Sequence, residues 1–559
     1  MATFTLTLID TVGVQSYIFG SNRLRENLGA SQLVYALTDE WLQASLEEKS
    51  VVGTSHNLNA DRTINVKRTL TPENDLQAEV IFAGGGNALV LFREHAAAIA
   101  CVRHLSRKLL TDAPGLEIAV AHRQFEWESE LGGPDGTYSK LQADLAHAKQ
   151  QRRPAAVLLG QSVTMECSST GLPAVTFFRF GPDDQQPLSA DALAKAEDET
   201  RDAANDRLRG MLKDSTRGFE FTDELDKLVS GAGDKSYIAV VHADGNGIGS
   251  RFKQLVDNTP TSRACLDGLR KLSQAVNEAG KQALRATVQA LVTAISPPHR
   301  EREELEDFYD GLPKYSSTVR YLPFRPIIFG GDDLTFVCDG RLGLPLAAIY
   351  LKAWEQASAQ LPEGGQAYAY AGVAVVKTHY PFVRAYKLGE DLCNQTKKAV
   401  KEARKPGSAM DWHFALSGIF GEIAAIRARE YQIQHRSLTV RPIALAPDLL
   451  NPPWRTWKHL QYLVGVFGGE LIDERYRFDP KGKPYANTNA VKGLCEALRA
   501  GPNEVRTFRL ARAMDPLPLL DASTIALQET GWSGASTPYF DPIEALDFFL
   551  PLEEWENLR

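Results

Sequence analysis

Three aspartates in the second half of the chain have the spacing and the glycine-rich surroundings of a metal site. Asp332 and Asp333 end the segment FGGDD (329–333), which lies between two apolar, strand-like runs. Asp244 directly follows another apolar run, YIAVVHA (237–243). Carboxylates brought close together repel one another unless a divalent cation lies between them. The three aspartates are therefore candidate catalytic residues and candidate ligands of Mg²⁺ or Mn²⁺.

The turn after Asp244 is suited to binding phosphate. Gly245, Asn246 and Gly247 follow the aspartate, and a helix is expected to begin near Arg251. Glycines let backbone N–H groups approach phosphate oxygens closely, and a helix N-terminus favours an anion. The sequence therefore predicts nucleotide contacts at Gly245, Asn246 and Gly247.

Taken alone, the two glycines and two aspartates of FGGDD also fit an ordinary hairpin turn. Both residue types tolerate the positive φ angles that two-residue hairpin turns require. Whether this segment is a turn or a metal site mounted on a turn depends on the rest of the chain.

The N-terminal part of the chain repeats the order of elements found around FGGDD. A strand ends at Asp10, and a later hairpin, EVIFAGGGNALVLF (79–92), has Gly86 and Asn87 at its tip. Aligning Asp10 with Asp244 places Gly86 and Asn87 on the two hairpin aspartates. The order β-α-β-β-α-β is ferredoxin-like and brings the end of the first strand beside the hairpin tip. We therefore expect an α+β fold with two ferredoxin-like units, of which the second alone has hairpin carboxylates.

Composition bounds the class of protein. The 559 residues are 43% hydrophobic with a net charge of −8, which is ordinary for a soluble protein and argues against holding nucleic acid by bulk charge. No apolar run approaches the roughly 20 residues that span a bilayer, and no signal peptide is expected. The six cysteines form no CxxC pair, which predicts reduced thiols and a cytoplasmic location.

With these residues in place, the chain resembles the large palm-domain subunit of type III CRISPR effector complexes, the cyclic-oligoadenylate synthase family. More distantly it is similar to diguanylate cyclases and class III nucleotidyl cyclases. The segments GVQSYIFGSNRLRENLGASQLVYAL (13–37) and GEDLCNQTK (389–397) carry the resemblance together with FGGDD, over residues 1–420. It implies two ferredoxin-like palms packed as a pseudo-dimer. It also implies metal binding by Asp244, Asp332 and Asp333, and contact of Lys397 with the substrate triphosphate.

The function implied by the resemblance is metal-dependent nucleotidyl transfer. ATP, or another nucleoside triphosphate, would be converted into a cyclic nucleotide or oligonucleotide messenger in antiviral defence. The implied partners are an RNA or protein activator and subunits of an effector complex, with no membrane. Two alternatives stay open: a catalytically silent palm-domain scaffold of an RNA-guided complex, and a diguanylate-type cyclase. The preference for ATP rests on the resemblance alone.

The sequence departs from this family in two respects. No His-Asp dipeptide occurs, so no nuclease domain of that type is expected. In the segment MECSSTGLPAVTFF (165–178), which resembles the family's zinc-bearing segment, Cys167 has no second cysteine, so no structural zinc is expected. A stand-alone signalling enzyme and a subunit of a complex are equally compatible with these losses.

Four domains are expected along the chain. Residues 1–153 form a degenerate first palm and 154–230 a small linker domain. Residues 231–412 form the catalytic second palm with an insertion near 257–322, and 413–559 form a helical C-terminal domain. Within the insertion, residues 296–317 are rich in charge and proline, which predicts a loop.

Overall fold

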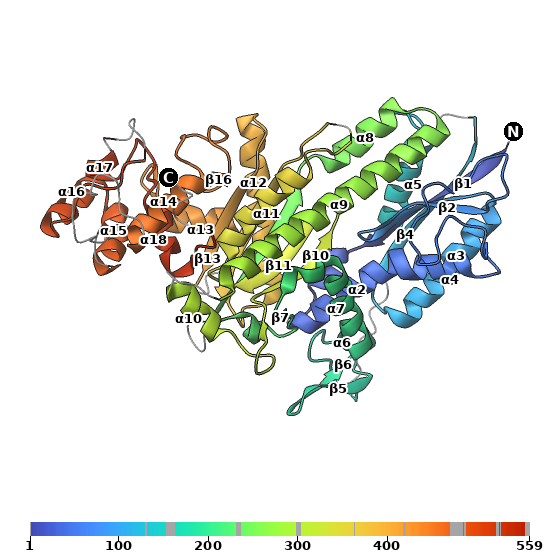
Figure 1. Cartoon of the computed structure of the whole chain (residues 1–559), viewed down its shortest axis with the longest axis horizontal. Coiled ribbons are helices and arrows are strands. Elements are labelled where there is room, and N and C mark those ends of the chain that lie inside the picture. Colours follow the sequence, from blue (N-terminus) through green and yellow to red (C-terminus); the bar gives the residue numbers. More distant parts are fainter. Residues whose placement is uncertain are drawn as a thin grey trace.

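The computed structural model describes residues 2–128, 131–152, 163–230, 236–297, 303–362, 364–416, 421–469, 485, 488–520, 525 and 527–553. The domain boundaries expected at 153 and at 230–231 therefore lie at or outside the edges of the described residues. Figure 1 shows the N-terminal unit at one end, a second mixed unit in the middle and a mainly helical part at the other end. None of the helices in the described part of the chain is long and apolar enough to span a membrane.

The N-terminal unit is a four-stranded antiparallel sheet with helices on both faces. The sheet has the strand order β2-β3-β1-β4. Its strands are β1 (Thr3–Val12), β2 (Ala78–Gly84), β3 (Asn87–Phe92) and β4 (Glu117–Glu126). Its helices are α1 (Val14–Ile18), α2 (Leu24–Ala36), a π-helical turn (Leu37–Trp41), α3 (Leu42–Glu47), α4 (His95–Asp112) and α5 (Thr137–Gln151).

The second unit contains the same four-strand arrangement inside a larger sheet. Its strand order is β10-β11-β8-β12-β13-β16, so β10-β11-β8-β12 corresponds to β2-β3-β1-β4. The strands are β8 (Tyr237–Gly245), β10 (Phe324–Gly330), β11 (Asp333–Asp339), β12 (Ala369–Lys377), β13 (Ala409–Ala415) and β16 (Ile443–Ala444). The main helices are α8 (Ile248–Asn258), α9 (Ser262–Ile295), α11 (Gly343–Ala357) and α12 (Phe382–Ala403).

Strand register relates the two units residue by residue. Asp10 pairs with Asn87 across β1 and β3, and Asp244 pairs with Asp333 across β8 and β11. Both hairpins also have an irregularity at the same distance from the tip, between Val80 and Phe82 in one and between Pro326 and Ile328 in the other. The register therefore agrees with the alignment of the two halves made from sequence.

Each unit places its first helices against the sheet of the other. From the first unit, Phe19 beside α1 stacks on Tyr386 of α12, with ring centroids 3.8 Å apart. From the second unit, Leu255 of α8 and Leu266 of α9 join the hydrophobic core formed by Leu6 and other residues of the first sheet. Burial of these apolar side chains is the main favourable term that holds the two units together.

Helix α9 runs across both units (Figure 1). Near its start, Arg263 and Arg270 form ion pairs with Glu79 of β2, whose side chain is fully buried. Further along, Gly280 lies so close to the carbonyl of Gly331 at the second hairpin tip that a Cβ atom would overlap it. Removing one partner of a buried ion pair leaves an uncompensated charge, so these contacts strongly disfavour separation of the units.

The remaining elements lie around this pair of units. Residues 163–230 contain the hairpin β5 (Thr176–Gly181) and β6 (Asp184–Leu188), the helices α6 (Ala190–Ala196) and α7 (Asp198–Leu212), and β7 (Phe219–Glu220), which pairs with β9 (Arg320–Tyr321). The described C-terminal helices are α13 (Ile423–Glu430), α14 (Trp457–Gly468), α15 (Thr488–Ala500), α16 (Pro502–Ala511), α17 (Leu527–Thr530) and α18 (Phe540–Ala545).

One expectation about the insertion is wrong. The segment predicted to be a loop contains helix α10 (Glu303–Gly311), which packs Leu305 and Phe308 into the core beside α9. The density of charge in this segment concealed two apolar residues three positions apart, which is helical spacing.

Candidate active site

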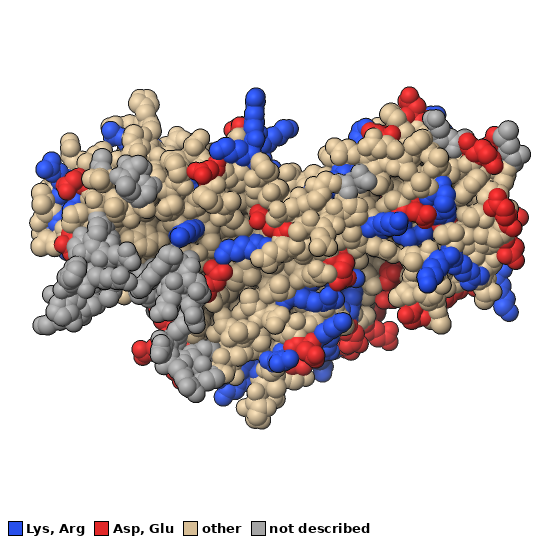
Figure 2. Space-filling model, turned by 45° about the horizontal axis from the view of Figure 1, so that its top comes forward, with Lys and Arg blue, Asp and Glu red and all other residues tan. Residues whose placement is uncertain are grey.

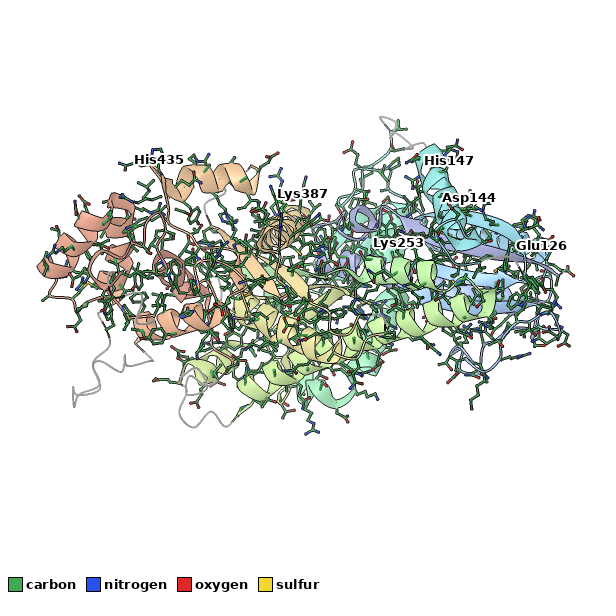
Figure 3. The ribbon with its side chains drawn as sticks, turned by 90° about the horizontal axis from the view of Figure 1, so that it is seen from above. Glu126, Asp144, His147, Lys253, Lys387 and His435 are labelled. Carbon is green, nitrogen blue, oxygen red and sulfur yellow. The ribbon has the colours of Figure 1, made fainter. Side chains whose placement is uncertain are left out.

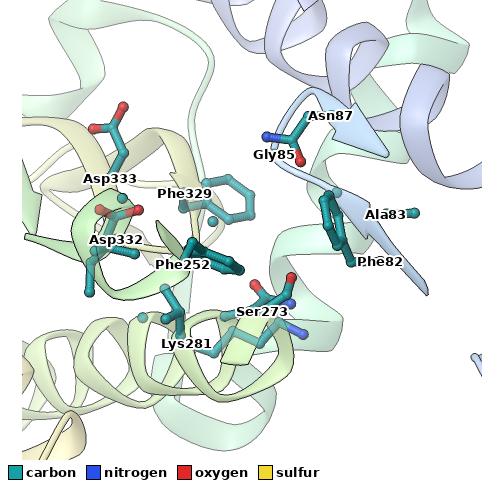
Figure 4. A pocket seen from close by; sticks show the side chains of 18 of the residues that line it. Phe82, Ala83, Gly85, Asn87, Phe252, Ser273, Lys281, Phe329, Asp332 and Asp333 are labelled. Carbon is teal, nitrogen blue, oxygen red and sulfur yellow. The ribbon is translucent and has the colours of Figure 1, made fainter. Parts of the chain in front are cut away.

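The two hairpin tips face each other across one cavity of about 1100 Å³. Gly84, Gly85 and Asn87 line it from the first unit, and Gly330 to Asp333 line it from the second. Figure 4 shows Asp332 and Asp333 on one side and Gly85 and Asn87 on the other. The volume lies just above the range of about 300–1,000 Å³ usual for small-molecule sites.

Helices from both units complete the walls of this cavity. Phe252 and Lys253 of α8, Ser273 and Lys281 of α9, and Arg207 of α7 are among the lining residues. Seen from above in Figure 3, Lys253 lies between α12, marked by Lys387, and α5, marked by Asp144 and His147. On the face shown in Figure 2, basic and acidic side chains are interspersed, in keeping with the net charge of −8.

Both aspartates of the hairpin turn are partly buried carboxylates with raised pKa values. The positive φ angle of the turn is at Gly331 (63°), and neither aspartate has a positive φ. Burial, with an added contribution from Asp332 and Glu390, raises the pKa of Asp333 to about 7. Burial likewise raises the pKa of Asp332 to about 6. Two-fifths of the Asp333 side chain is still exposed, and this residue lines the cavity, but its Oδ1 atom is buried and has no hydrogen-bond partner.

A neutral histidine lies beneath Asp333. His242 Nδ1 lies 3.1 Å from the Thr335 hydroxyl and 3.5 Å from Asp333 Oδ1. Burial, with the nearby Lys397 charge, lowers the pKa of His242 to about 4. At neutral pH the imidazole therefore supplies no positive charge to balance Asp333.

Asp244 is held by Lys397, the residue that the resemblance had assigned to the substrate triphosphate. Lys397 of α12 forms an ion pair with Asp244, and Lys149 of α5 forms the equivalent pair with Asp10. The structure thus brings Lys397 to the predicted site but places its ammonium group on the aspartate. Contact of Lys397 with a triphosphate stays a prediction.

The turn from Gly245 to Gly247 is built differently from the expectation. The Gly245 N–H donates to the carbonyl of Asp332 over 2.9 Å, and the Asn246 N–H donates to the carbonyl of Tyr368 over 2.7 Å. These two N–H groups are engaged in the fold and do not form a free phosphate cradle. Gly247 has a φ of 76° and precedes the first residue of α8, as Gly13 with a φ of 66° precedes α1.

The hairpin carboxylates have the chemistry of a hard-cation site. In the described part of the chain, no group of three or more His, Cys, Asp or Glu side chains stands close enough to hold a metal ion, and Asp244 is engaged by Lys397. Asp332 and Asp333 nevertheless offer adjacent carboxylate oxygens, one of them buried without a partner. Burial and repulsion between neighbouring carboxylates disfavour the ionised forms of these two aspartates in the metal-free protein, and carboxylate oxygens are the ligands that suit Mg²⁺ or Mn²⁺.

Sequence reasoning missed two cations of the cavity wall. The guanidinium of Arg207 lies between the rings of Tyr35 and Phe329, 4.2 and 4.1 Å from their centroids. Lys281 lines the cavity and has no ion-pair partner among the described residues. Acidic residues surround Arg207 in α7, so its sequence gives no sign of the cavity, whereas Gly280, directly before Lys281 in the middle of α9, is an unusual helix-interior residue that could have indicated a packing site.

The raised pKa values predict a pH-dependent effect of replacing Asp333 in the metal-free protein. A carboxyl group with a raised folded pKa binds its proton more tightly when folded, so wild-type stability falls as pH rises from about 4 to 7. Asp333→Asn should therefore raise Tm at pH 8, by the equivalent of about 1–2 kcal/mol because solvent screens the exposed part of the side chain, and change it little at pH 4. Thermal unfolding in EDTA at both pH values measures this effect, and equal shifts at both would contradict it.

Comparison with known proteins places this fold. No family model and no curated protein matches the sequence. The structure is similar to that of Csm1 from T. onnurineus, with 12% identity and a TM-score of 0.50 over 98% of this chain and 70% of the other. It is also similar to a Csm1–Csm4 cassette in complex with pppApA, with 13% identity and a TM-score of 0.51 over the same shares.

These structures define the class of fold. The chain therefore has the fold of Csm1, the palm-domain subunit of type III CRISPR-Csm complexes, and the resemblance found from sequence is confirmed at the level of the fold.

Proposed function

We propose that the chain is a metal-dependent nucleotidyltransferase that joins nucleotides in the cavity between its two hairpin tips. The observation that carries the proposal is the asymmetry of that cavity. The hairpin tips of the two units line the same cavity and have the same strand register relative to the first strand of their unit. Only the second tip, however, has carboxylates. ATP is the preferred substrate, because a structure of the same fold was solved with pppApA bound.

In this proposal the two units act as the two palms of a pseudo-dimer. The four corresponding strands have the same order in both units. The first helices of each unit pack into a hydrophobic core shared with the other unit, and both observations support that arrangement. The nucleotide whose α-phosphate reacts would lie at the second palm, where Asp332 and Asp333 are. The nucleotide that supplies the attacking ribose hydroxyl would lie at the first palm, beside Asn87.

The reaction is the displacement of pyrophosphate by a ribose hydroxyl. A new P–O bond forms at the α-phosphate, the bond to pyrophosphate breaks, and the hydroxyl proton is released. Asp332, Asp333 and Asp244 would hold Mg²⁺ or Mn²⁺, which when bound lowers the pKa of the hydroxyl and neutralises phosphate charge. The walls of the cavity position the two nucleotides, and such positioning accounts for much of the rate in reactions of this type.

Release of Asp244 is part of this proposal. With Lys397 on Asp244, only the hairpin pair is available to a cation. A bound triphosphate would offer Lys397 a more highly charged partner, so substrate and metal binding would favour each other. The predicted contact of Lys397 with the triphosphate and its observed ion pair would then be two states of one side chain.

Lys281 should contribute to substrate binding through its charge. Lys281→Ala is expected to raise KM for ATP about 10-fold, equivalent to about 1.4 kcal/mol, with a smaller effect on kcat, because a phosphate contact made equally in both states acts mainly on binding. Lys271→Ala, an exposed lysine on the same helix outside the cavity, is the control. Equal KM values for the two variants would remove Lys281 from the site.

Product analysis tests the function as a whole. The purified protein, alone and with RNA or a Csm4-like partner subunit, is incubated with each nucleoside triphosphate and Mn²⁺, and the products are identified by mass spectrometry. Cyclic or linear oligoadenylates from ATP are the expected result. Conversion of GTP only would identify a diguanylate-type cyclase, and no product under any of these conditions would identify a scaffold.

A further inference from the structure

The backbone conformation of Gly245 does not require a glycine at this position. Its φ is not in the left-handed region, and its N–H and its place in β8 are those of an ordinary strand residue. A Cβ atom on Gly245, however, would lie 2.6 Å from the Cβ of Asp332 and 3.3 Å from its Oδ2. Real Cβ atoms essentially never approach so closely. The space above Gly245 is therefore filled by the Asp332 side chain.

The first unit has the opposite arrangement at the equivalent pair of positions. Thr11 stands where Gly245 stands, and Gly86 stands where Asp332 stands. The Thr11 N–H and hydroxyl both donate to the carbonyl of Gly86, over 2.8 and 2.9 Å. The first of these bonds is the counterpart of the bond from Gly245 to Asp332. A Cβ atom on Gly86 would overlap the Thr11 hydroxyl oxygen.

Strand end and hairpin tip thus approach so closely in each unit that only one of the two positions has a side chain. We infer that Gly245 is a positioning residue, whose missing Cβ lets Asp332 lie over the end of β8 in the geometry needed for metal binding. In the first unit, the Thr11 hydroxyl occupies that space, and the φ of 85° at Gly86 also disfavours any side chain at position 86. This inference rests on the proposed function and adds to it the residue that makes room for the carboxylate of Asp332.

A double-mutant cycle on stability tests the shared space. Gly245→Ala should lower Tm by several degrees, because the new Cβ displaces the hairpin tip. In the Asp332→Gly background the same change should cost little, since the contact that it meets has been removed. The other close neighbour of a Cβ at this position is Trp354 Cζ2, at 3.1 Å. A cost that persists in the Asp332→Gly background would assign the glycine to Trp354 and overturn the inference.

Mn²⁺ binding to the nucleotide-free protein, measured by electron paramagnetic resonance or calorimetry, tests the positioning role. Gly245→Ala should weaken Mn²⁺ binding by about 10- to 100-fold, the usual effect of losing a residue that orients a ligand. Gly181→Ala, at a strand end with open space around it, is the matched control and should bind as the wild type does. Wild-type affinity in Gly245→Ala would overturn the inference.

The outcomes separate this inference from the proposed function. If the wild type itself binds no Mn²⁺, the proposed function fails, while the stability cycle still decides whether Asp332 fills the space above Gly245. If Gly245→Ala alone does not fold, recovery of folding in the Gly245→Ala/Asp332→Gly variant supports the inference. Failure of that double variant to fold, with Asp332→Gly alone folded, contradicts it.

Discussion

The double variant Asp332→Ala/Asp333→Ala is expected to lose nucleotide conversion by at least about 10³-fold while keeping its fold. Metal-ion catalysis contributes several kcal/mol to transition-state stabilisation, and each ~1.36 kcal/mol corresponds to a factor of ten in rate. Removal of two carboxylates with raised pKa values relieves repulsion in the metal-free protein, so Tm at pH 8 should not fall. Initial rates of product formation from ATP and Mn²⁺, with Tm measured in EDTA, give both quantities.

A matched control removes two adjacent carboxylates elsewhere. Glu303→Ala/Glu304→Ala lies at the exposed start of α10, outside the cavity, and should keep wild-type rates. Full activity in the hairpin double variant would mean that FGGDD is only a turn. Loss of activity accompanied by unfolding would assign the two aspartates to stability and not to chemistry.

The second large effect is an asymmetry between two aspartates with almost the same surroundings. Asp244 and Asp10 both lie near the end of the first strand of their unit, and both form an ion pair with a lysine of a later helix. Only Asp244 lies opposite a hairpin aspartate, because its ladder partner is Asp333 whereas that of Asp10 is Asn87. Asp244→Asn should therefore lower kcat by about 10³-fold, and Asp10→Asn by less than about 10-fold.

Steady-state kinetics with ATP on the two single variants measure this asymmetry. The change to Asn keeps the size of the side chain and removes its charge. Each variant therefore removes one lysine–aspartate ion pair, that of Lys397 in Asp244→Asn and that of Lys149 in Asp10→Asn. Equal losses would mean that the lysine pairs and not the metal site are what activity requires. A larger loss in Asp10→Asn would reverse the assignment of the working palm.

Much of the fold could be predicted from sequence because it is encoded locally. The apolar strands before Asp10 and Asp244 and the glycine-rich hairpin tips recur in one order, and that order has a known sheet arrangement. From it followed the pairing of Asp244 with Asp333, although 88 residues lie between them. The place of Lys397 near the aspartates, by contrast, followed from the family resemblance and not from the order of elements.

Features that depend on contacts between distant elements could not be predicted. Arg207 reaches the cavity because α7 packs beside α2 and β10, which nothing in its own sequence indicates. The N–H groups of Gly245 and Asn246 looked available to phosphate, and only the tertiary structure shows that they donate to Asp332 and Tyr368. Glycine-rich turns permit both outcomes, and the neighbouring strands decide between them.

Helix α9 connects the base of the first hairpin with the tip of the second. Arg270 is held by Glu79 at the base of the first hairpin, and Gly280 abuts Gly331 at the tip of the second. Ten residues of α-helix separate these two points, which is about 15 Å along a rod that cannot bend sharply without breaking its own hydrogen bonds. One continuous helix thus contacts both hairpins that border the gap in which two nucleotides would meet, so a slide or tilt of α9 as a whole would change the width of that gap.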